Sequence, residues 1–119
     1  MDIFCNRDFN HFYVSAPASP PDNVNAVANS STSIGVTWDM VPAIDQNGII
    51  TMYEVRYEPL ETFGGQIQTQ NMAVLAPNMS VTLTDLQEFV NYNISVRAYT
   101  SVGEGPYSSE VTAMTQQDG

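Results

Sequence analysis

The side chains that most often carry out catalysis are scarce in this sequence and stand near its start. The chain holds one cysteine, Cys5, and one histidine, His11, with Asp8 between them. These three side chains could be imagined as a metal cluster, but zinc sites need clustered Cys and His, and one of each falls short. The remaining chain has neither a histidine for a Ser/His/Asp or Cys/His set nor a glycine-rich phosphate loop. We therefore expect no enzyme activity, no cofactor and no metal.

Carboxylates gather in two segments that the turn residues mark as loops. Asp39 and Asp45 follow Trp38, and Glu104 precedes Pro106. A calcium ion takes about six to eight oxygen ligands held close together, and no dense Asp/Asn/Gly spacing supplies them here. We expect these carboxylates to form a solvated acidic rim.

Three Asn-x-Ser/Thr sequons are the strongest modification signal, at Asn29, Asn78 and Asn93. None has proline at its middle position, so each matches the acceptor sequence for N-linked glycosylation. Asn29 and Asn78 fall in predicted loops, whereas Asn93 faces solvent if Tyr92 and Ile94 face a core. The sequons favour an extracellular location, and the alternative is that they stay unused on a polar surface.

The charge restricts the kinds of partner. Thirteen acidic residues against three arginines and no lysine give a net charge of −10. Nucleic-acid binding depends on Lys and Arg that neutralise phosphates, and anionic membranes would repel such a chain. We expect no nucleic acid and no direct membrane contact, and instead a protein partner with a neutral or basic surface. The alternative is that the acidic residues only keep the domain soluble.

The length of 119 residues fits one domain, which can bury enough surface to fold without a metal or disulfide. With Cys5 as the single cysteine, no internal disulfide can form. Cys5 is then a free thiol, one half of a bridge to another segment, or a residue without a role. The first 14 residues do not form a signal peptide, and no apolar run is long enough to span a membrane.

Apolar residues alternate with polar ones along most of the chain after residue 20. Alternation over four to eight residues, between Gly-, Asn- and Ser-rich turns, predicts strands with one face in a core. No helical stripe of period 3.6 interrupts the pattern, and the repeated short strands predict an antiparallel sandwich. The alternating residues are Ile34, Val36 and Trp38; Tyr53, Val55 and Tyr57; Val81 and Leu83; and Tyr92, Ile94, Val96 and Ala98.

In their order and spacing these segments resemble a fibronectin type III domain over about residues 20–115. Residues 21–24 are similar to the family's entry into its first strand, and residues 47–57 to its third strand. Leu83 and Leu86, followed by Tyr92, resemble its leucine and tyrosine corner. Residues 95–108 are similar to its sixth strand, the following loop and the start of its seventh strand.

The resemblance implies an all-β fold, a seven-stranded antiparallel immunoglobulin-like β-sandwich. Residues 1–19 would then be a poorly ordered leader and 116–119 a tail. The sequence departs from the family pattern at two places. Gly35 weakens its strand or lets a neighbour approach, and Phe89-Val90 places apolar residues at the corner. The expected core signature is Trp38, Tyr53, Val55, Tyr57, Leu83, Leu86, Tyr92, Ile94, Val96 and Ala98.

The resemblance also implies a function, that of a non-catalytic extracellular module in a cell-surface receptor or adhesion protein. Such a module spaces its neighbours and binds protein, and we expect the isolated domain to be a monomer. Three alternatives stay open, namely an appended module of an enzyme such as a receptor tyrosine phosphatase or kinase, a pure structural linker, and a cytoplasmic muscle-type module. Loops on a rigid sandwich commonly carry binding, so the candidate contacts are Asp39, Asp45, Asn47, Ser101, Val102 and Glu104.

Overall fold

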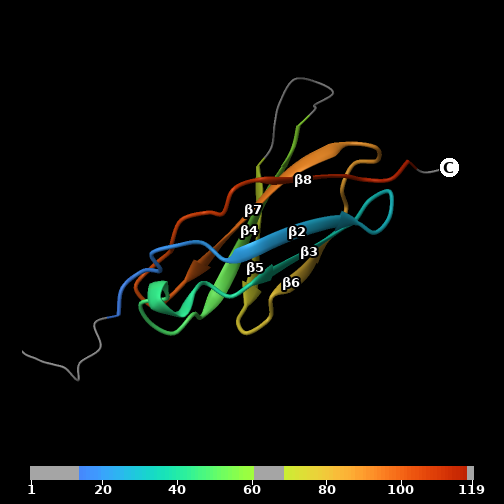
Figure 1. Ribbon diagram of the computed structural model, residues 1–119. Coiled ribbons are helices and arrows are strands. Elements are labelled where there is room, and N and C mark those ends of the chain that lie inside the picture. The colour runs from blue at the N-terminus through green and yellow to red at the C-terminus, as the bar shows by residue number, and fades with distance from the viewer. Residues whose placement is uncertain (1–13, 61–68, 118–119) are drawn as a thin grey trace, which may run out of the picture.

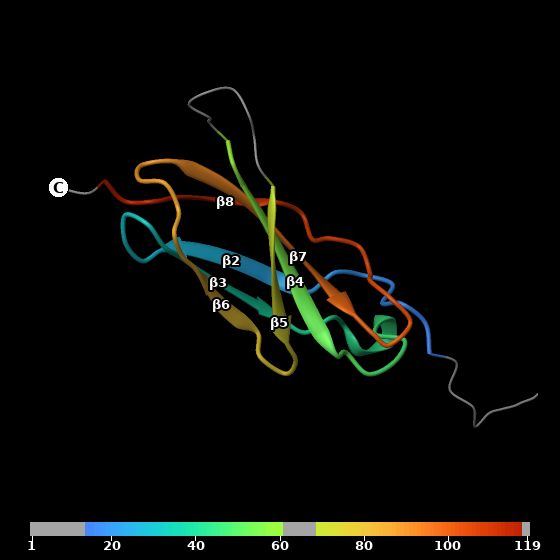
Figure 2. The same cartoon turned by 180° about the vertical axis from the view of Figure 1, so that it is seen from behind.

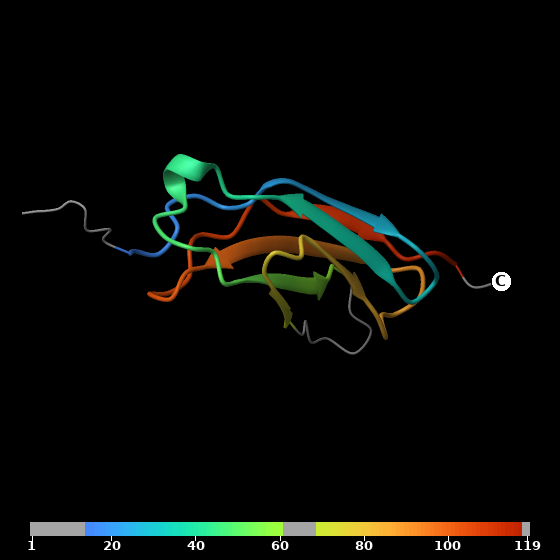
Figure 3. The ribbon, with the colours of Figure 1, turned by 90° about the horizontal axis from the view of Figure 1, so that it is seen from below.

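The computed structural model describes residues 14–60 and 69–117, and within them it contains two antiparallel β-sheets (Figures 1 and 2). One sheet has the strand order β2-β3-β6 and the other β5-β4-β7-β8. Figure 3 shows the two sheets as stacked layers. The predicted all-β, seven-stranded antiparallel sandwich is confirmed. The strands are β2 (Asp22–Ala28), β3 (Ile34–Asp39), β4 (Met52–Pro59), β5 (Gln70–Leu75), β6 (Ser80–Leu83), β7 (Asn91–Tyr99) and β8 (Val111–Met114).

The core lies between the two sheets and is made by the inward-facing residues of each alternating run. The Trp38 ring meets the Tyr53 ring edge-on, with centroids 5.3 Å apart, and so joins the two sheets. Among the described residues the indole Nε1 of Trp38 is buried without a hydrogen-bond partner. All ten residues of the expected core signature are buried, together with Val41, Val74, Val90 and Ala113.

The corner between β6 and β7 is closed by hydrogen bonds from inside the core. The Tyr92 hydroxyl accepts a hydrogen bond of 2.8 Å from the backbone N–H of Gln87. The Thr115 hydroxyl accepts one of 2.9 Å from the N–H of Val90 and donates one of 2.6 Å to the carbonyl of Gln87. The two apolar residues at this corner differ in exposure, since Val90 is buried and Phe89 is 58% exposed.

Residues 15 and 18, which belong to the expected leader, form backbone hydrogen bonds to the domain. Ser15 and Ala18 donate backbone hydrogen bonds of 2.9 and 2.8 Å to the carbonyls of Asn47 and Asp45. The Thr100 hydroxyl donates one of 2.7 Å to the carbonyl of Ser15. Apart from the Thr100 hydroxyl, the groups in these bonds belong to the backbone, so side-chain patterns gave no sign of them. We call residues 14–18 the strap; residues 1–13 lie outside the description.

Two glycines allow the strap to lie against the domain. A Cβ atom placed on Gly105 would lie 2.8 Å from the carbonyl oxygen of Pro17, and one on Gly48 would lie 2.8 Å from a Val14 methyl group. Both distances are too short for any larger residue without movement of the strap. At the other terminus Gln116, expected to start the tail, donates a hydrogen bond of 3.1 Å to the carbonyl of Ser30.

Candidate functional site

Two loops and the strap meet at one end of the sandwich (Figure 1). The loop between β3 and β4 contains the short 3-10 helix η1 (Ala43–Asp45), and the other loop joins β7 to β8. The loops are fixed to one another where the N–H of Thr51 donates a 2.8 Å hydrogen bond to the carbonyl of Tyr99. We call residues 14–18, 40–51 and 100–107 the loop end.

The predicted contact residues of the β3–β4 loop are partly occupied within the domain. Asp39 is exposed at the end of β3 and accepts a 2.7 Å hydrogen bond from Asn23. Asp45 and Asn47 hold the strap through their carbonyl groups, and the Asn47 side-chain amide donates a further 3.1 Å hydrogen bond to the carbonyl of Ala16. The side chain of Asp45 is half-buried and that of Asn47 exposed.

The predicted contact residues of the β7–β8 loop are all open to solvent. Ser101 and Glu104 are exposed, and the apolar side chain of Val102 is 61% exposed. The hydrogen bond of 3.0 Å from the N–H of Thr100 to the carbonyl of Gly103 fixes this loop as a tight turn. The fold therefore brings both predicted loops to one end, with the strap between them.

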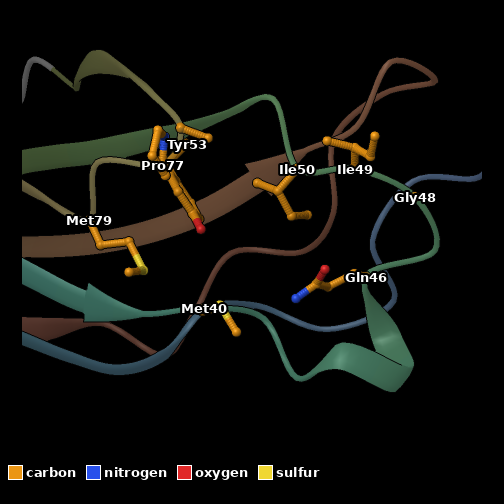
Figure 4. A pocket seen from close by; sticks show the side chains of 9 residues that line it. Met40, Gln46, Gly48, Ile49, Ile50, Tyr53, Pro77 and Met79 are labelled. Carbon is orange, nitrogen blue, oxygen red and sulfur yellow. The ribbon is translucent and has the colours of Figure 1, made fainter.

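An apolar groove lies beside the β3–β4 loop and was not predicted (Figure 4). It has a volume of about 290 Å³ and lies against the turn that joins β5 to β6. The pair Ile49-Ile50 was the available signal, because adjacent apolar residues break the alternation that precedes β4. Met40 is 54% exposed and Ile49 is 83% exposed. The groove is lined by Met40, Gln46, Gly48, Ile49, Ile50, Tyr53, Ala76, Pro77 and Met79.

The three sequon asparagines lie in three different settings. Asn29 is exposed after β2, and its side-chain amide lies 3.0 Å from a Cβ atom placed on Gly35, so Gly35 does admit a neighbour. Asn78 is exposed in the β5–β6 turn. Asn93 is half-buried on β7, and its side-chain oxygen accepts a 3.0 Å hydrogen bond from Thr112.

A charged and aromatic network, which sequence reasoning also missed, lies on the outer face of the sheet β5-β4-β7-β8. Glu54 accepts hydrogen bonds of 2.7, 3.0 and 3.2 Å from Arg97, Tyr99 and Tyr107. The guanidinium groups of Arg56 and Arg97 lie 4.2 and 4.4 Å from the centre of the Tyr107 ring. The outward positions of Glu54 and Arg56 were visible in the alternation, but not their partners.

The network changes the ionisation of its carboxylate. Burial would raise the pKa of Glu54, but the hydrogen bonds from Arg97, Tyr99 and Tyr107, together with the charge of Arg97, outweigh burial and lower it. Burial and the neighbouring Glu54 carboxylate raise the pKa of the Tyr107 hydroxyl. The ion pair therefore stays charged at neutral pH.

The acidic rim does not converge into a metal site in the described part of the chain. No group of three or more His, Cys, Asp or Glu residues there could hold a metal ion. Cys5, Asp8 and His11 lie outside residues 14–60 and 69–117. Within these same ranges no helix is long and apolar enough to cross a membrane.

Comparisons with known proteins connect this geometry to a family. A family model described as the fibronectin type III domain matches residues 19–114. Receptor-type tyrosine-protein phosphatase F of Mus musculus is 37% identical over 106 residues, which are 87% of this chain and 5% of that protein. Protein sidekick-1 of Gallus gallus is also 37% identical, with the same coverage. The chain thus spans about 5% of the length of the curated relatives it matches.

A solved structure gives the same result at the level of the fold. The third fibronectin III domain of human KIAA0343 protein superimposes with a TM-score of 0.75 and is 25% identical. The match covers 87% of each chain.

Proposed function

This chain belongs to the fibronectin type III family, and we propose from that premise that it is a non-catalytic extracellular module of a cell-surface receptor or adhesion protein. It spaces neighbouring modules in its own chain and binds another protein through the loop end. The relatives support this role, because one is named as a receptor-type phosphatase and matches over only 5% of its length. The three sequons support the extracellular location.

One structural observation carries the binding role, namely that the strap joins both loops into one surface. Backbone hydrogen bonds connect the strap to Asp45 and Asn47, and a side-chain hydrogen bond connects it to Thr100. A surface held in this way loses little conformational entropy on binding. Exposed Ile44 and Val102 give it apolar contacts.

The charge around these apolar contacts defines the kind of partner. Asp45 and Glu104 lie in the two loops, and the whole chain carries a charge of −10. Opposite charge speeds association and like charge opposes it, so the partner presents a neutral or basic surface. The negative charges of two copies of the domain also repel each other, which keeps the isolated domain a monomer.

A binding screen with matched variants tests the loop end. A multimer of the domain is applied to purified cell-surface ectodomains, and each binder is retested with Ile44→Ser plus Val102→Ser. Val27→Ser is the control, because Val27 is also exposed but lies on β2, outside the loop end. We expect the double variant to lose binding at least tenfold and the control to keep it. Binding that survives the double variant, or a screen without any binder, contradicts the proposal.

A pure spacer is the second candidate, and one observation favours it. The segment before β2 and the segment after β8 lie at opposite ends of the sandwich (Figure 1), as a chain of modules joined end to end requires. A screen without binders, from a domain that folds normally, would support this function instead.

A further inference from the structure

The apolar groove exposes apolar side chains on its rim. Met40 and Ile49 are both more than half exposed on its rim. Exposed apolar surface is costly in water, so adjoining apolar residues in a groove offer a contact surface to a partly apolar group. Any group that covers the groove has to fit between the β3–β4 loop and the β5–β6 turn.

A sequon lies on the edge of this groove. Asn78 is followed by Met79 and Ser80, and the residues on either side of it, Pro77 and Met79, both line the groove. The exposed Asn78 side chain has no hydrogen-bond partner among the residues the structure describes. A group attached to Asn78 therefore begins between two residues that line the groove.

The backbone at this position is firmly held. The N–H of Asn78 donates a 3.1 Å hydrogen bond to the carbonyl of Leu75, and the carbonyl of Met79 accepts a 3.1 Å hydrogen bond from Trp38. The attachment point therefore keeps a constant position relative to the groove.

The other two sequons do not border the groove. Asn29 lies in the β2–β3 turn, at the end of the sandwich opposite the loop end (Figure 1). Asn93 lies on β7, and its side-chain oxygen is occupied by Thr112. None of the three asparagines lines the groove itself, and only Asn78 has neighbours in the chain that do.

We propose that Asn78 carries an N-linked glycan whose first N-acetylglucosamine residues pack over the apolar groove and cover it. One face of a pyranose ring presents C–H groups, and the acetyl group adds a methyl. These groups can contact the Met40, Ile49 and Met79 side chains while the ring hydroxyls stay in water. The inference rests on the proposed extracellular location, where N-glycosylation occurs.

The modification is a group transfer from a lipid-linked oligosaccharide pyrophosphate. The side-chain nitrogen of Asn78 forms a bond to the anomeric carbon of N-acetylglucosamine and loses one proton. The bond from that carbon to the pyrophosphate oxygen breaks, and the lipid pyrophosphate leaves with the electron pair. Nothing is oxidised or reduced.

The first measurement asks whether Asn78 is modified. The chain is secreted from mammalian cells as wild type, Asn78→Gln and Ser80→Ala, and each product is weighed before and after glycosidase treatment. Ser80→Ala removes the sequon and keeps the asparagine, so it separates loss of the glycan from loss of Asn78. We expect the glycan at peptide 78–80 in wild type and in Asn29→Gln and Asn93→Gln, and its absence in both sequon variants.

The second measurement asks whether the sugar covers the groove. The glycan is trimmed to one N-acetylglucosamine, and methionine methyl groups are observed by NMR with and without the sugar. We expect shifts and sugar-to-methyl contacts at Met40 and Met79, and none at Met114, which is exposed on β8. Binding of an apolar fluorescent dye should rise in Ser80→Ala.

Each outcome bears on a different statement. An unmodified Asn78 beside a glycosylated Asn29 or Asn93 overturns this inference and leaves the extracellular module intact. A modified Asn78 without methyl shifts overturns the covering role, and concentration-dependent association of the trimmed domain would then identify a second copy as the occupant. A secreted chain with no glycan at any sequon overturns this inference and also removes the support that the sequons give to the proposed function.

Discussion

Tyr92 shows how one side chain connects the core to a loop. Its ring is buried, and its hydroxyl accepts the backbone N–H of Gln87. Removing the hydroxyl leaves that donor without its partner, which costs about 1–3 kcal/mol. We predict that Tyr92→Phe lowers the free energy of unfolding by about that amount in urea titrations at neutral pH. Tyr57→Phe is the control, since within residues 14–60 and 69–117 the Tyr57 hydroxyl bonds only the exposed Gln70 side chain. Equal losses would contradict the prediction.

Glu54 makes the stability of the fold depend on pH. Its pKa is lower in the folded protein than its ordinary value of 4.5. A group with a lowered folded pKa contributes stability above its unfolded pKa, and this contribution is lost as the pH falls through the folded pKa. We predict that Glu54→Gln destabilises the domain at pH 7 and that the difference from wild type shrinks below pH about 4.5.

Unfolding titrations across the acid range test this dependence. Glu110→Gln is the control, because the Glu110 side chain is half exposed and lies 3.9 Å from Arg56. Its effect should be small at every pH, as is usual for exposed ion pairs. A Glu54→Gln difference that grows as the pH falls would contradict the assigned direction of the pKa.

At the scale of elements, the strap depends on the absence of a side chain at position 105. A Cβ atom there would lie 2.8 Å from the carbonyl oxygen of Pro17. We predict that Gly105→Ala displaces the strap and costs about 1–3 kcal/mol, with faster hydrogen exchange at the amides of Ser15 and Ala18. Gly103→Ala is the control, because nothing lies within 4 Å of a Cβ atom at Gly103. Unchanged exchange in Gly105→Ala would show that the strap tolerates the added methyl group.

The strands could be predicted to different degrees for a physical reason. β3, β4 and β7 bury every second residue, so their alternation was plain. β5 lies at the edge of its sheet and buries only Val74, so its own sequence gave no such pattern.

The candidate site was only partly predictable. Its two loops followed from the resemblance, but the strap is held mainly by backbone atoms. The groove combines residues 40–53 with residues 76–79, which meet only in the folded chain. Local sequence patterns do not show which distant segments of the chain come into contact.

For the whole molecule, the charge of −10 opposes the compact state. Sodium chloride screens charges that lie apart on the surface and affects the partly buried Glu54–Arg97 pair less. We predict that Tm rises by a few degrees between about 10 mM and about 500 mM NaCl. A variant with Glu88, Glu104 and Glu110 changed to Gln, three exposed acidic residues, should show a smaller rise. A Tm that falls with salt would contradict the dominance of self-repulsion.

Because the segments before β2 and after β8 lie at opposite ends of the sandwich, their placement also determines how the domain responds to tension (Figure 1). β2 pairs along its length with β3, and β8 with β7. A force that pulls the two termini apart acts parallel to these strands, so it loads the hydrogen bonds of each pair in shear rather than opening them one after another. The domain should therefore extend abruptly at a high force rather than unravel gradually, which suits a link between surfaces that are pulled apart.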